Sequence, residues 1–147
     1  MNRINLICLG VRDMAKSLAF YQNLGFKTYE KNDNPPIVFF DNRGTKLELF
    51  PLGDLARDID SEYPPEPNRV GFSGITLACN AKSEREVDEL MERAAQCGGT
   101  IAKKPQKVSW GGYSGYFRDP DGYYWEVAYA DLWKFDENDM LIIEKPQ

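Results

Sequence analysis

Apolar and aromatic residues concentrate in a hairpin pattern between residues 110 and 129. Both flanks are rich in aromatic and β-branched side chains, which favour strands. Between them, Asp119, Pro120 and Gly122 occupy the positions that a type I turn prefers. One acid, Glu126, interrupts the second apolar strand. A charge among apolar neighbours is costly unless it meets water, a partner or a ligand, so the pattern predicts a hairpin with a functional acid.

The same spacing of aspartate, glycine and glutamate occurs earlier in the chain. Asp41, Gly44 and Glu48 precede Asp119, Gly122 and Glu126 by one constant offset. A repeated hairpin with an acid in its last strand indicates an internal duplication.

The apolar periodicity of residues 3–50 predicts a first module with the order β-α-β-β-β. We expect a strand over 3–11, a helix over 13–24, and strands over 26–31, 37–40 and 46–50. Residues 72–130 predict a second module with the same order. Its expected elements are a strand over 72–79, a helix opened by a capping box at Ser83 and Glu86, and strands over 100–103, 113–117 and 123–129.

Two segments fall outside the repeat. Residues 51–71 contain four prolines and read as a connecting loop, with one helical turn around 54–59. A loop of this length is either functional or a plain spacer. The tail, residues 131–147, carries aromatic and apolar side chains and is predicted to pack on the domain or on a second subunit.

Length, charge and cysteine content limit the kinds of partner and location that we expect for this protein. At 147 residues the chain is expected to form one domain. A net charge of -5 argues against a nucleic-acid partner, and no apolar run is long enough to span a membrane. Three cysteines without metal-binding spacing, and an N-terminus without a signal-peptide pattern, predict a cytoplasmic protein with reduced thiols.

The chain contains no histidine. This removes the commonest general base, the commonest metal ligand and every Ser-His or Cys-His nucleophile pair. Chemistry in this protein must therefore use carboxylates, lysine, tyrosine, cysteine or backbone groups.

The paired modules resemble the vicinal oxygen chelate superfamily, which includes glyoxalase I, bleomycin-resistance proteins and extradiol dioxygenases. The residues that carry the resemblance are Leu9–Asp13, Phe20–Tyr21, Leu24–Phe26, Glu48, Asp119–Gly122 and Trp125–Glu126. The resemblance implies an α+β fold of two tandem β-α-β-β-β modules. They would form a curved, partly open barrel around a cup, with the helices outside.

In metal enzymes of this superfamily, each module offers one ligand from its first strand and one from its last. Glu48 and Glu126 match the last-strand positions, whereas Leu6 and Gly74 stand where histidine is common. Two carboxylates without imidazoles leave an incomplete shell for zinc, nickel or iron. We therefore expect no metal cofactor; a weakly bound divalent metal is the alternative.

Strand alternation predicts the lining of the cup. Glu48 and Glu126 are the candidate catalytic residues, able to move a proton or attract a ligand; the alternative is that they are remnants of a lost metal site. The predicted ligand-binding residues, from the strands and the rim, are Leu6, Cys8, Lys46, Phe50, Thr76, Trp110, Tyr113 and Tyr124. Pockets of this kind bind small organic molecules, and the acidic charge favours cationic or aromatic ones.

Three functions fit this pattern. The first is a glyoxalase-like or bleomycin-resistance-like protein that binds a small organic ligand without metal. The second is a lyase or isomerase that uses Glu48 or Glu126 as a general base. The third is a non-catalytic structural or regulatory dimer. In each case we expect a homodimer, because small proteins of this resemblance commonly associate through their modules.

Overall fold

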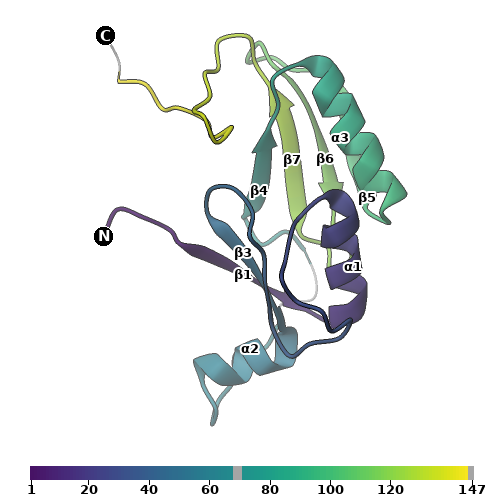
Figure 1. The fold of residues 1–147 in the computed structure, drawn as a ribbon, viewed down its shortest axis with the longest axis vertical. Helices are drawn as coiled ribbons and strands as arrows, with labels where there is room; N and C mark the ends of the chain where they lie inside the picture. The colour runs from purple at the N-terminus through teal and green to yellow at the C-terminus, as the bar shows by residue number, and fades with distance from the viewer. Residues whose placement is uncertain (68–70, 146–147) are drawn as a thin grey trace. The chain divides into compact units, whose positions relative to one another are not determined.

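The computed structural model describes residues 1–67 and 71–145 of the chain. The protein divides into two compact units, Met1–Ile75 and Thr76–Gln147, each with its own β-sheet (Figure 1). Within the described residues there are three helices and two sheets, and neither sheet closes on itself. The expected α+β class is confirmed.

Unit one is built around a three-stranded sheet. Its elements are β1 (Leu6–Val11), α1 (Met14–Leu24), β2 (Val38–Phe39), β3 (Lys46–Pro51) and α2 (Leu52–Ile59). Strand β3 is central, parallel to β1 and antiparallel to β2. Helix α1 begins where the Asp13 carboxylate accepts a hydrogen bond from the Lys16 backbone N–H at 3.0 Å, and it ends at Gly25 in the left-handed region. Leu18 and Tyr21 of α1 are fully buried in the core.

Unit two is built around a four-stranded sheet covered on one face by a helix. Its elements are β4 (Thr76–Asn80), α3 (Glu84–Gln96), β5 (Thr100–Lys107), β6 (Tyr113–Arg118) and β7 (Tyr124–Tyr129). The strand order is β4-β7-β6-β5. Helix α3 buries Val87, Met91 and Ala94, its apolar face. On the sheet, Phe117 and Trp125 are buried with their rings stacked at 6.1 Å between centroids.

Strand pairing confirms the internal repeat. In unit one, Glu48 lies opposite Cys8 of the parallel strand β1 and Phe39 of the antiparallel strand β2. In unit two, Glu126 lies opposite Ala78 of the parallel strand β4 and Tyr116 of the antiparallel strand β6. Each glutamate therefore occupies the same position in an inner strand, between the first strand of its unit and the hairpin partner.

The strand predicted over residues 26–31 is absent. The segment precedes β2 in the chain and lies beside it, but side chains make several of its hydrogen bonds. One backbone bond joins the Asp41 N–H to the Lys27 carbonyl at 2.7 Å, whereas the Thr28 hydroxyl donates to the Phe39 carbonyl at 2.8 Å. The Glu30 carboxylate accepts from the next two backbone N–H groups. Polar side chains that bond to nearby backbone compete with a regular ladder, and here they replace it.

The predicted connecting loop, residues 51–71, holds a helix longer than one turn. Helix α2 follows β3 directly and packs on β1 at Gly10. A Cβ at Gly10 would lie 2.5 Å from Leu52 Cδ1, so the close approach of α2 requires glycine there. Residues 68–70 of this loop lie outside the described residues.

The tail, predicted over residues 131–147, contacts its own unit. Trp133 stacks on Trp110 with 5.8 Å between ring centroids. Phe135 pairs with Leu141 in an isolated antiparallel bridge, and Lys82 binds Asp139. Residues 146–147 lie outside the described part. Packing on the domain is thus found, while packing on a second subunit stays a prediction.

The capping box at α3 is formed in part. The Ser83 hydroxyl accepts from the Glu86 N–H at 3.1 Å, as predicted. The Glu86 carboxylate instead accepts from the N–H of Lys82, one residue before Ser83, at 2.6 Å. The cap still satisfies two backbone donors at the start of the helix.

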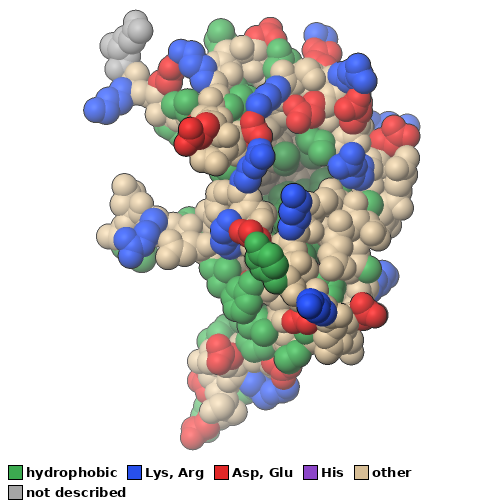
Figure 2. All heavy atoms as spheres, in the orientation of Figure 1, with side chains coloured by type: hydrophobic (Ala, Val, Ile, Leu, Met, Phe, Trp, Pro, Cys, Tyr) green, Lys and Arg blue, Asp and Glu red, His purple; other side chains and the backbone are tan. Residues whose placement is uncertain are grey.

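The surface in view mixes charges of both signs. Lys and Arg side chains stand among Asp and Glu side chains rather than in one continuous basic patch (Figure 2). Among the helices of the described residues, none has the length and apolar character needed to cross a membrane.

Candidate functional site

Glu48 is a buried acid at the centre of the unit-one sheet, with 7% of its surface exposed. The Cys8 thiol on β1 donates a hydrogen bond to its carboxylate. Burial, then the charge and hydrogen bond of Glu48, and last the charge of Asp58 raise the pKa of Cys8 to about 11. Cys8 therefore stays protonated near neutral pH and acts as a donor to Glu48, not as a nucleophile.

Helix α2 covers part of the same sheet face. Gly10 shares the face of Cys8 because alternate strand residues point the same way, and Leu52 and Leu55 of α2 pack on Gly10. The charge of Asp58, also on α2, reaches Cys8. The sequence predicted only one helical turn around 54–59, and Leu52 and Leu55, three positions apart, were a usable signal for the longer helix.

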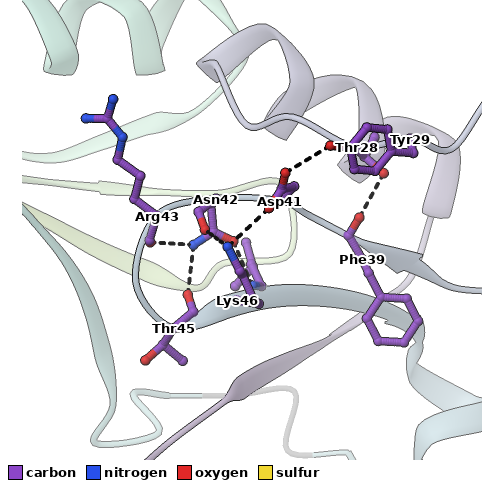
Figure 3. A network of polar contacts seen from close by, with 9 residues as sticks. Thr28, Tyr29, Phe39, Asp41, Asn42, Arg43, Thr45 and Lys46 are labelled. Atoms are coloured by element: carbon purple, nitrogen blue, oxygen red, sulfur yellow. Dashed lines mark hydrogen bonds and ion pairs between the residues drawn. The ribbon is translucent and has the colours of Figure 1, made fainter. Parts of the chain in front are cut away.

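Lys46 was predicted to line the cup, and Leu6 lies opposite it on β1. The Lys46 ammonium is instead bound to the neighbouring turn (Figure 3). It contacts the Asp41 carboxylate at 3.2 Å and the Asn42 carbonyl oxygen. The Tyr29 hydroxyl also donates to Asp41, at 3.2 Å. These contacts lower the pKa of Asp41, first through the hydrogen bond from Lys46.

The two repeated turns are stabilised by different residues. Asp119 accepts hydrogen bonds from the N–H groups of Asp121 and Tyr123, both at 2.9 Å, and is a turn residue as predicted. In unit one this role belongs to Asn42, whose side chain accepts from Leu47 N–H and donates to the Thr45 carbonyl. Asp41 was predicted as a turn residue; its carboxylate anchors Lys46 instead.

Glu126 lies on the face of the unit-two sheet opposite α3, half-buried. The Tyr116 hydroxyl donates a hydrogen bond to its carboxylate. Burial, and then the negative charge of Glu126, raises the pKa of Tyr116. The Lys103 ammonium lies 5.8 Å from the centroid of the Tyr116 ring. Sequence reasoning missed both partners, although the position of the Asp119 turn implies the pairing of Tyr116 with Glu126.

A second row of side chains lies on the same face. Arg118 pairs with Tyr124, and Tyr124 pairs with Thr76 across the next strand. The Arg118 guanidinium carbon is 5.9 Å from the Tyr124 ring centroid. Of the predicted ligand-binding residues, the structure thus brings Thr76 and Tyr124 onto the face of Glu126.

Leu6, Cys8 and Phe50 take alternate places on the face of Glu48. Leu6 is 40% exposed, whereas Phe50 is half-buried opposite Gly10. This is the arrangement that strand alternation predicted. Ligand contact by these residues stays a prediction.

Trp110 and Tyr113 make contacts within unit two. The Trp110 ring stacks on Trp133 and lies against Gly112, where a Cβ would be only 1.8 Å from a ring carbon. The Tyr113 hydroxyl donates to Asp88 of α3 at 2.8 Å. Tyr113 therefore faces the helix and not the face of Glu126.

The donor set does not fit a metal centre of the kind that the resemblance implies. Leu6 and Gly74 offer no donor side chain. Across residues 1–67 and 71–145, no three or more aspartate, glutamate or cysteine side chains gather closely enough to hold an ion. That the protein works without a bound metal ion remains a prediction, and it rests on this poor donor set.

A family model described as Glyoxalase/Bleomycin resistance protein/Dioxygenase superfamily matches residues 3–127. The chain belongs to this superfamily. The match includes both glutamates and every strand except the last two residues of β7.

Individual relatives are distant. The chain is 28% identical to a metallothiol transferase FosB of Lysinibacillus sphaericus, over 88% of this chain and 83% of the relative. A crystal structure of a glyoxalase-related enzyme from Fulvimarina pelagi superposes with a TM-score of 0.85 at 29% identity, covering 99% of this chain and 100% of that one. A lactoylglutathione lyase from Agrobacterium tumefaciens gives 0.66 at 27% identity, covering 92% and 98%.

Proposed function

We propose that this superfamily member binds a small organic ligand on the sheet faces that carry Glu48 and Glu126, without a resident transition metal. The observation that carries the proposal is the repeated arrangement of the two acids. Each accepts a hydrogen bond from an uncharged donor on a neighbouring strand, Cys8 or Tyr116. A carboxylate has about four acceptor positions, so one such donor leaves capacity for a ligand.

The surroundings of Glu126 favour an organic ligand. Tyr116 and Tyr124 supply aromatic surface, and Thr76 supplies an exposed hydroxyl on the same face. Sites for small molecules combine such apolar and aromatic walls with a few placed polar groups.

A lyase or isomerase reaction is the second candidate. The superfamily includes lyases, as the Agrobacterium tumefaciens relative illustrates. Glu126 is half-buried beside a proton donor, which suits a group that takes and returns a proton. Metal-dependent thiol transfer, which the name of the Lysinibacillus sphaericus relative indicates, is less favoured because this chain lacks histidine ligands.

The third candidate is a structural or regulatory dimer without a ligand. A cytoplasmic location and the absence of nucleic-acid and membrane partners accompany all three candidates as predictions. Ligand-dependent thermal shifts separate the third candidate from the first two.

The test begins with the natural ligand. Protein purified under native conditions is analysed by mass spectrometry for a co-purifying small molecule, which is then titrated into Glu126→Gln. Loss of one charge-assisted hydrogen bond should weaken binding by about 10-fold or more. Glu137→Gln, the same change at an exposed tail position, is the control and should bind normally.

The outcomes distinguish the candidates. Turnover lost in Glu126→Gln with binding kept identifies the lyase or isomerase. Unchanged binding together with a lowered melting temperature would make Glu126 structural and refute the proposed site.

A further inference from the structure

A β-bulge decides which way Lys103 points. On β5, Ile101 pairs with Phe117 and Lys103 pairs with Tyr116, so two steps along β5 match one step along β6. Phe117 and Tyr116 point to opposite faces because they are adjacent. In a regular strand Lys103 would share the face of Ile101, toward α3. The irregularity transfers it to the face of Glu126, and bulges characteristically re-aim a side chain in this way.

Two independent observations support this irregular path of β5. The Lys103 ammonium lies 5.8 Å from the Tyr116 ring centroid, on the face of Glu126. In addition, a Cβ at Gly115 would lie 3.0 Å from the Lys103 carbonyl oxygen and 3.1 Å from the Pro105 nitrogen. Strand β5 thus runs unusually close to β6, and Gly115 leaves the space for it.

Arg118 brings a second cation to the same face. It lies two residues from Tyr116 on β6, which places it about 7 Å farther along the strand. Its side chain is exposed and rests on the Tyr124 ring. Lys103, Arg118 and Glu126 together carry a net positive charge, and the Glu126 carboxylate already accepts from Tyr116.

We infer that this face of the β4-β7-β6-β5 sheet binds a small organic anion that also carries a hydrogen-bond donor. Its carboxylate or other oxyanion group meets Lys103 and Arg118, its donor meets Glu126, and its apolar part lies against Tyr116 and Tyr124. The inference rests on the proposed function and names the ligand class of its unit-two site. It reverses the preference for cationic ligands that the acidic composition suggests. Arginine and lysine are the side chains that recognise such groups.

Four probes of one shape test the charge preference: benzoate, phenylphosphonate, neutral benzamide and cationic benzamidine. Each is titrated into the full-length protein by calorimetry at low ionic strength. Benzoate and phenylphosphonate should bind at least tenfold more tightly than benzamide. The stronger of the two anions identifies the group that the site prefers. Binding should also weaken as salt is added.

Variants locate the binding site. Lys103→Gln and Arg118→Gln should each weaken anion binding by about 10-fold. Lys104→Gln makes the same charge change at the exposed neighbouring residue and should change the affinity by less than about twofold. Circular dichroism and melting temperature confirm that all three variants are folded.

Equal weakening by Lys104→Gln, or equal binding of benzamidine and benzoate, would overturn the anion inference and leave the proposed function standing. Absence of saturable binding for all four probes would also overturn it. The proposed function is judged separately, by the co-purified ligand and Glu126→Gln.

Discussion

The contact between Cys8 and Glu48 makes a quantitative prediction about thiol reactivity. The pKa of Cys8 is raised from 9.0 to about 11. At pH 8 an ordinary thiol is roughly one-tenth thiolate, whereas Cys8 would be roughly one-thousandth. A thiolate of higher pKa is also the stronger nucleophile, which offsets about tenfold of the hundredfold lower thiolate fraction. Alkylation of Cys8 should therefore be about tenfold slower than that of a model thiol.

Glu48→Gln should lower the pKa of Cys8 part of the way towards its ordinary value. The substitution removes the charge of Glu48, the second cause of the raised pKa, and leaves burial, the largest cause. The pKa of Cys8 should then fall below 11 but remain above 9.0. Asp58→Asn, which removes the smallest contribution, should give a smaller decrease.

The assay is the pH dependence of iodoacetamide alkylation, followed by mass spectrometry. Cys79→Ser and Cys97→Ser provide the background, so that Cys8 is the one thiol left of the three. Asp33→Asn, an exposed carboxylate of the same unit, is the control and should leave the profile unchanged. A pKa near 9.0 in the background protein, or an unchanged pKa in Glu48→Gln, would refute the reasoning.

The same shift predicts a loss of stability at alkaline pH. The folded state binds the Cys8 proton more tightly than the unfolded state does, so this contribution is complete below pH 9. It is lost as the pH rises from 9 towards 11. Chemical denaturation across this window should show a smaller decline for Cys8→Ala, and an equal decline would contradict the linkage.

Three further predictions follow from the structure and composition. Light scattering at micromolar concentration should give the mass of a homodimer, and a monomer mass would refute it. Elemental analysis after dialysis should find no stoichiometric zinc, nickel or iron, since no histidine is present; one ion per chain would overturn this. Gly115→Ala should reduce the free energy of unfolding by about 1–3 kcal/mol, because the added Cβ meets β5 backbone and Met91 Cε at 3.0 Å. Urea denaturation measures this loss, and Gly111→Ala is a comparison without such a clash but with backbone strain.

Features encoded in a few adjacent residues were predictable. The Asp119 turn, the Asp13 cap and the Gly25 stop each need only local chemistry, and the structure has all three. Features that depend on competing hydrogen bonds or on pairing with strands distant in the sequence were not predictable. Residues 26–31 look like a strand, but the hydrogen bonds of Thr28 and Glu30 to nearby backbone prevent a ladder.

The residues of the candidate site also fall into those that local patterning predicted and those that it did not. Strand alternation placed Tyr124 and Thr76 beside Glu126 because period-two patterning is local. Lys103 escaped prediction because its direction depends on a bulge, which requires the pairing of β5 with β6. Lys46 is on the predicted strand, yet its long flexible side chain turns to Asp41, a choice that backbone patterning does not determine.

The two copies of the repeat place their glutamates in different surroundings. In unit one, Glu48 is 7% exposed, α2 covers part of its face, and Lys46 is engaged by Asp41. In unit two, Glu126 is half-buried on a face shared with Lys103 and Arg118. We expect Glu48 to contribute mainly to stability because it is buried, and Glu126 to contribute mainly to ligand affinity because it is half-buried beside half-buried Lys103 and exposed Arg118.

This asymmetry can be measured with one pair of matched variants. Glu48→Gln should lower the free energy of unfolding by about 1 kcal/mol or more, since its hydrogen bond from Cys8 loses charge assistance in a buried setting. Glu126→Gln should leave stability nearly unchanged and alter ligand affinity instead. Urea denaturation and calorimetry on both variants decide the matter. Equal effects of the two substitutions on stability and on binding would mean that the repeat has kept its functional symmetry.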